Sequence, residues 1–130
     1  MILAIRTDSP MAELYLYSKN HKPIDTDIWQ ADRRLADELL PHIQSILSKN
    51  TFDLSDLSGI IIFTGEGSFT GLRIGTTVAN TLAYSMAIPI VEARGDNWPK
   101  VGFSNLKQAQ LGSYVIPKYS KGPNITKPKK

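Results

Sequence analysis

The chain has 130 residues, of which 42% are apolar and 21% are charged, and this composition suffices for one folded domain of ordinary size. It contains no cysteine, which excludes a disulfide framework, thiolate chemistry and cysteine metal sites. No apolar run approaches the roughly 18 residues of a membrane helix, and the N-terminus lacks a signal-peptide pattern, so we expect a cytoplasmic protein.

The beginning of the chain predicts three strands. Apolar runs over residues 2–5 and 13–17 flank a group of turn formers, which is typical of a hairpin. Alternation of side chains over residues 24–29 predicts a third strand at the edge of the sheet.

A helix should follow these strands. Asp32 is placed to cap it, and its apolar face, which includes Leu35 and Leu39, continues to about Lys49. Pro41 lies inside the pattern, so we expect a kink there. The two histidines of the chain have no carboxylates at ligand spacing around them, and we expect them to be structural or solvated.

The middle of the chain predicts a strand, a glycine-rich turn and a second helix. The short β-branched run over residues 59–63 follows a capped turn and reads as a buried strand. Residues 71–86 have helical spacing, and residues 88–91 predict a fifth strand reached by a right-handed parallel crossover. The predicted fold is therefore α/β, with a mixed five-stranded sheet and two main helices.

The glycine-rich turn is a candidate anion site, because glycines permit close backbone approach where a helix begins. It lacks the Gly-Lys-Ser/Thr ending of a P-loop and the third glycine of a dinucleotide fingerprint, and Glu66 opposes a phosphate there. Ser68 reads as a helix cap rather than as a nucleophile. The weak candidates for nucleotide binding are Gly65, Gly67, Ser68 and Thr70.

The second helix carries a row of small residues at four-residue spacing: Gly71, Gly75, Ala79 and Ala83. Glycine inside a helix costs roughly 1 kcal/mol relative to alanine, so something should pack closely against this row. The sequence leaves open whether the row faces the sheet of the chain itself or a helix of a partner.

The turn and the helix start contain a nine-residue motif, Gly67-Ser68-Phe69-Thr70-Gly71-Leu72-Arg73-Ile74-Gly75. It resembles the signature of the TsaB (YeaZ) family, the dimerisation subunit of the bacterial machinery that makes threonylcarbamoyladenosine (t6A) in tRNA. The similarity extends over residues 1 to about 92. The resemblance implies an actin-like ATPase, RNase H-like domain over residues 1–96.

The same resemblance implies a non-catalytic subunit without a cofactor, which pairs with a TsaD-like catalytic subunit in a complex that includes a TsaE-like ATPase. We also expect homodimers when the protein is alone. Residues expected at the partner interface are Leu35, Leu39, Gly71, Gly75, Ala79 and Ala83.

Arg6 stands after the first strand, where the family usually has an aspartate, and this substitution speaks against metal-assisted hydrolysis. Two roles remain for Arg6, a salt bridge or a phosphate anchor. Asp8 is the one nearby acid that could still hold magnesium.

The end of the chain differs in charge from the rest. Residues 1–96 carry 8 basic and 12 acidic side chains, whereas residues 97–130 carry seven lysines and no acid. We expect residues 97–130 to form a basic extension in place of the family's second domain, with a short helix near residues 104–110.

From Pro117 onward the sequence is too rich in proline, glycine and lysine to build a core. This end is either a solvated tail or a contact for a partner groove or for tRNA phosphates. The candidate contacts are Lys118, Tyr119, Lys121, Ile125 and Lys127. Two other functions therefore stay open, namely a nucleotide-binding domain that uses the turn over residues 65–71 and an RNA-binding module that uses the lysine-rich end.

Overall fold

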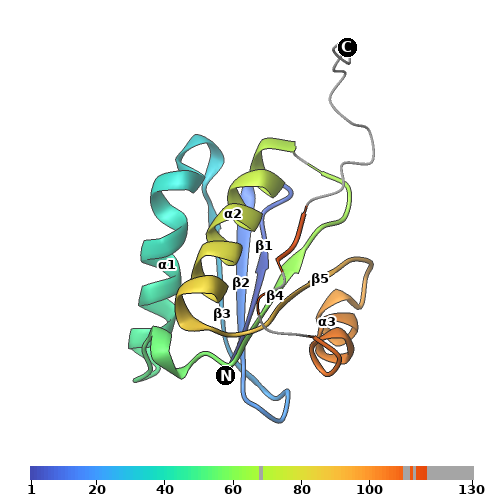
Figure 1. The fold of residues 1–130 in the computed structure, drawn as a ribbon. Helices are drawn as coiled ribbons and strands as arrows, with labels where there is room; N and C mark the ends of the chain where they lie inside the picture. Colours follow the sequence, from blue (N-terminus) through green and yellow to red (C-terminus); the bar gives the residue numbers. More distant parts are fainter. Residues whose placement is uncertain (68, 110–111, 113, 117–130) are drawn as a thin grey trace.

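The computed structural model of the chain describes residues 1–67, 69–109, 112 and 114–116 (Figure 1). Its centre is one five-stranded sheet in the order β3-β2-β1-β4-β5. The strands are β1 (Ile2–Arg6), β2 (Met11–Tyr17), β3 (Pro23–Gln30), β4 (Gly59–Phe63) and β5 (Ile90–Ala93). The first three pair antiparallel, whereas β4 and β5 continue the sheet in parallel from β1, which confirms the predicted mixed sheet.

Helices cover both faces of this sheet. The long helices α1 (Leu35–Lys49) and α2 (Phe69–Met86) lie side by side on one face, and α3 (Trp98–Leu106) covers part of the other (Figure 1). Two single turns, η1 (Asp32–Arg34) and η2 (Leu54–Asp56), precede α1 and β4. None of the described helices is both long and apolar enough to cross a membrane.

The two faces of the sheet have different cores. The face under α1 and α2 is aliphatic and fully buried. It is built from Leu3, Ile5, Leu14, Leu16, Ile60 and Ile62, together with the inner sides of the two helices. The face under α3 is aromatic, because Trp98 meets Tyr15 and Phe63 edge to face at 5.9 Å and 5.6 Å between ring centroids.

The predicted start of the first helix is wrong in one respect. Asp32 does not cap it, because its backbone is left-handed, with φ of 48°, and its side chain makes no cap hydrogen bond. Instead its carboxylate accepts a hydrogen bond from Gln30 Nε2 at 3.0 Å, and the chain makes a short 3-10 turn before α1 begins. Pro41 lies inside α1 as expected. A capping box between Asp53 and Asp56 closes the turn before β4.

Two element positions toward the end of the described chain also differ from prediction. The fifth strand begins at Ile90 because Ala87, with φ of 55°, closes the end of α2, and the next amide still bonds back to Ala83 O. The short helix is not at 104–110 but begins at Trp98, with Pro99 in its first turn, where the absent N–H costs nothing.

Both histidines lie in aromatic stacks. His42 stacks on Trp29 at 3.7 Å, and its Nδ1 lies 2.8 Å from Asp27 Oδ2, so this contact ties α1 to the edge strand β3. His21 stacks on Phe103 of α3 at 4.1 Å. These contacts fit the structural role expected for both rings.

Candidate functional site

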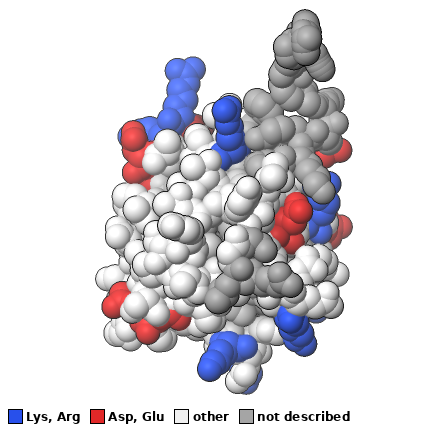
Figure 2. Space-filling view, viewed as in Figure 1, with Lys and Arg blue, Asp and Glu red and all other residues white. Residues whose placement is uncertain are grey.

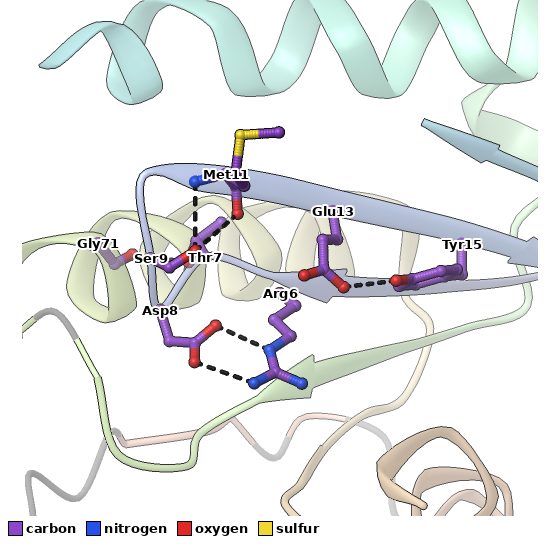
Figure 3. A network of polar contacts seen from close by, with 8 residues as sticks. All are labelled: Arg6, Thr7, Asp8, Ser9, Met11, Glu13, Tyr15 and Gly71. Atoms are coloured by element: carbon purple, nitrogen blue, oxygen red, sulfur yellow. Dashed lines mark hydrogen bonds and ion pairs between the residues drawn. The ribbon is translucent and has the colours of Figure 1, made fainter. Parts of the chain in front are cut away.

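The loop after β1 lies against the start of α2 (Figure 3). Thr7 is completely buried, and its hydroxyl donates a hydrogen bond to the carbonyl oxygen of Gly71 at 2.7 Å. A Cβ added at Gly75 would lie 2.1 Å from the same hydroxyl oxygen. Gly75, nearly two turns into α2, therefore leaves room for the side chain of Thr7, the residue that follows β1.

The glycine-rich turn is closed by the loop that follows β1. A Cβ at Gly67 would lie 2.4 Å from Asp8 Cβ and 2.6 Å from Asp8 O. A Cβ at Gly65 would lie 2.4 Å from the Phe63 ring. Both glycines are thus explained by close contacts inside the chain, without a ligand.

Arg6 forms the salt bridge that was one of its two predicted roles (Figure 3). Its Nε donates to one carboxylate oxygen of Asp8 at 2.8 Å and its second nitrogen to the other at 3.1 Å. The guanidinium lies 3.9 Å above the Phe63 ring, and hydrogen bonding to Asp8 raises the Arg6 pKa.

A nucleotide fits this turn poorly. The carboxylate of Asp8 is engaged by Arg6, its backbone fills the space beside Gly67, and the exposed acid Glu66 belongs to the same turn. A phosphate would meet two carboxylates there and would have to displace packed atoms. Thr70 is exposed, and Ser68 lies outside the described residues. In the part of the chain that the structure describes, no three His, Asp or Glu side chains gather into a metal site.

A second polar pair lies beside this loop on the sheet face under α3. The Tyr15 hydroxyl donates to a Glu13 carboxylate oxygen (Figure 3), and burial, followed by this hydrogen bond, raises the Tyr15 pKa. Glu13 is also paired with Arg6 in the β1–β2 register. Arg6 therefore has two carboxylates near it, that of Asp8 in a salt bridge and that of Glu13 across the hairpin.

The residues predicted at the partner interface are not on the surface. Leu35, Leu39, Ala79 and Ala83 are 5%, 0%, 0% and 4% exposed and belong to the core between the helices and the sheet. In the single chain these side chains pack inward, because the small residues let α2 settle close to its own sheet. Gly71 and Gly75 are buried as well.

The outer side of the same helix pair is exposed and free of charge. Exposed positions there are Leu40, Pro41, Gln44, Ser45 and Ser48 of α1 and Thr77, Thr81 and Tyr84 of α2. Neither helix contains Lys, Arg, Asp or Glu over residues 39–48 and 74–86. Figure 2 shows this surface as a mainly white area with charged side chains at its upper and lower ends. We call it the uncharged helix face.

Sequence reasoning missed the uncharged helix face, although a signal was present. Exposed helix positions usually include many charged residues, whereas α2 carries only Arg73 among its 18 residues. The predicted tail contacts Lys118, Tyr119, Lys121, Ile125 and Lys127 lie outside the described residues.

The five-stranded mixed sheet with helices on both faces defines an α/β domain, and the matches that follow assign it to the actin-like, RNase H-like class. A family model described as TsaD, tRNA N6-adenosine threonylcarbamoyltransferase, matches residues 29–93, which is half of the chain. The chain is 35% identical over 89 residues to the tRNA threonylcarbamoyladenosine biosynthesis protein TsaB of Bacillus subtilis, and these cover 68% of the chain and 33% of that protein. It is 31% identical over 90 residues to TsaB of Escherichia coli, covering 69% and 38% of the two.

The solved structure of YeaZ from Pseudomonas aeruginosa superposes with a TM-score of 0.65 at 26% identity and covers 72% of this chain and 43% of that one. The chain belongs to the TsaB (YeaZ) family. It spans about a third of the length of the curated relatives it matches.

Proposed function

We propose that the chain is a non-catalytic subunit that supports threonylcarbamoyladenosine modification of tRNA. The observation that carries this proposal is the match to the TsaB relatives, which extends over about two thirds of the chain. The closed turn supports the non-catalytic part, because Asp8, the one candidate magnesium ligand after β1, is held by Arg6.

The proposed subunit acts by pairing with a TsaD-like catalytic subunit through the uncharged helix face. Interface centres are depleted of charged residues, since a charge loses its hydration on burial, and tyrosine is enriched there. Tyr84 is 88% exposed and Leu40 is 38% exposed, so both large side chains are available for contact. Neither lies in the core that the chain builds for itself.

The proposed role as a partner subunit also implies a wider assembly. A TsaE-like ATPase completes the complex, the protein forms homodimers when the catalytic subunit is absent, and the complex works in the cytoplasm, where tRNA is modified. Both pairings use the uncharged helix face, so a homodimer and a heterodimer exclude one another at that surface.

Co-expression with the TsaD-like protein of the same organism tests the pairing. The chain should co-purify with it as a 1:1 complex, and the complex should replace the homodimer in light scattering. An unrelated actin-like ATPase from the same organism serves as the control. If the TsaD-like protein leaves the homodimer intact at equal micromolar concentrations, the proposed function is wrong.

A further inference from the structure

A short extended segment late in the chain is docked on α2 by one side chain. Asn80 Oδ1 accepts a hydrogen bond from the Val115 amide at 2.9 Å, and Asn80 Nδ2 donates to the Val115 carbonyl at 2.8 Å. The side-chain amide thus bonds to both backbone groups of one residue, as a neighbouring strand would in a sheet. These two bonds recognise an extended backbone and do not depend on its side chain.

The segment buries only its middle residue. Val115 is 7% exposed and joins the main aliphatic core, whereas Tyr114 and Ile116 are 69% and 66% exposed. The docking position therefore selects an apolar side chain of moderate size and leaves its two neighbours outside.

Open space borders this docked residue on both sides. A hollow of about 380 Å³ lies between α2 and the segment, and its lining includes Asn80 and Tyr84 of α2 and Tyr114 of the segment. Another of about 370 Å³ lies between β5 and the segment and is lined on the segment side by Tyr114, Val115 and Ile116. Open space thus borders the docked segment on its α2 side and on its β5 side.

We propose that Asn80 and these two hollows form a docking site for an extended peptide with a β-branched apolar residue. Val115 fills the site within the chain, and the equivalent segment of a second copy fills it when Val115 is displaced. Two hydrogen bonds and one valine hold the internal segment, which is a small enough contact for exchange. This site lies on the β5 side of α2. Its larger hollow borders the uncharged helix face at Thr81 and Tyr84, but Asn80 and the position of Val115 are not part of that face.

A labelled peptide tests the site in the full chain. The probe has the sequence of residues 112–117 with blocked termini, and the host is Val115→Asp, in which burial of a carboxylate expels the internal segment. We expect the peptide to bind this variant at least tenfold more tightly than the wild type, in which Val115 competes. Adding Asn80→Ala should weaken binding by about tenfold or more, because both backbone hydrogen bonds are lost.

Arg73→Ala in the same host is the matched control, since Arg73 is exposed on α2 about two turns before Asn80 and touches neither hollow. It should leave binding of the uncharged peptide unchanged. Equal binding with and without Asn80, or no binding to a folded Val115→Asp chain, overturns the proposal. If circular dichroism shows that Val115→Asp does not fold, the same peptide titrations are carried out on Val115→Ala, with and without Asn80→Ala, and the same outcomes support or overturn the proposal.

Discussion

The inner and outer sides of α2 differ in burial and in the kind of contact that they can make. On the inner side, Gly75 and Ala79 are buried against β1 and the sheet, and Thr7 fills the space that a side chain at 75 would need. On the outer side, Thr77, Thr81 and Tyr84 are exposed and no charged residue interrupts them. Small residues therefore mark the contact that the chain makes with itself, and the absence of charge marks the surface open to a partner.

The largest expected effect comes from a larger side chain on the inner side of α2, which tests whether that side is packed more tightly than the outer side. Gly75→Leu should destabilise the fold by about 3 kcal/mol or more, because its Cβ would overlap the Thr7 hydroxyl and the packed core cannot expand. Thr77→Leu, two residues later on the exposed side, should change the free energy of unfolding by less than about 0.5 kcal/mol. Urea unfolding of both variants measures this difference, and equal stability would mean that the inner side is not packed as described.

The glycine-rich turn offers a second, smaller test. Gly67→Ala should cost about 2 kcal/mol, since the methyl group would meet both Cβ and the carbonyl oxygen of Asp8. Glu66→Ala, in the same turn but exposed, should stay close to the wild type. Thermal unfolding followed by circular dichroism is sufficient, and a wild-type melting temperature for Gly67→Ala would show that the turn is open enough for a ligand.

The smallest expected effect on stability comes from removing the Tyr15 hydroxyl on the sheet face under α3, and this effect depends on pH. The pKa of Tyr15 is raised, so its contribution to stability is complete below about pH 10 and is lost as the pH rises above the unfolded value. Tyr15→Phe should be about 1 kcal/mol less stable at pH 7, because the hydrogen bond to Glu13 is absent. In urea unfolding the difference in stability between Tyr15→Phe and the wild type should stay constant up to about pH 10 and narrow above it. A difference that widens above about pH 10 would contradict the assignment.

Much of the fold could be read from the sequence because local patterns agreed with the sheet. The hairpin, the edge strand and the β-branched run of β4 each showed the strand pattern that the structure contains. The start of α1 could not be read in this way, because Asp32 takes a left-handed backbone and bonds to Gln30 instead of the helix. The position of α3 depends on burial of Trp98 and Phe103 against the sheet, which is a tertiary contact.

The site was predicted less well than the fold. The four-residue spacing of the small residues correctly placed Gly75 and Ala79 on one side of a helix. Spacing alone, however, does not tell whether that side faces the sheet or a partner. That choice was decided by Thr7, 68 positions earlier in the sequence, whose hydroxyl occupies the space left by Gly75. Likewise, Gly67 looked like part of a phosphate cradle until the position of Asp8 beside it was known.

The central claim is that the uncharged helix face binds the TsaD-like catalytic subunit, and the affinity of that pair measured by calorimetry tests it most directly. Thr77→Arg should weaken binding by roughly tenfold or more, because a charge would be buried at the contact, while circular dichroism stays unchanged. Thr26→Arg, exposed on the edge strand β3 away from α1 and α2, is the matched control and should bind as the wild type does. Unchanged affinity in Thr77→Arg, or equal losses in both variants, would contradict the account.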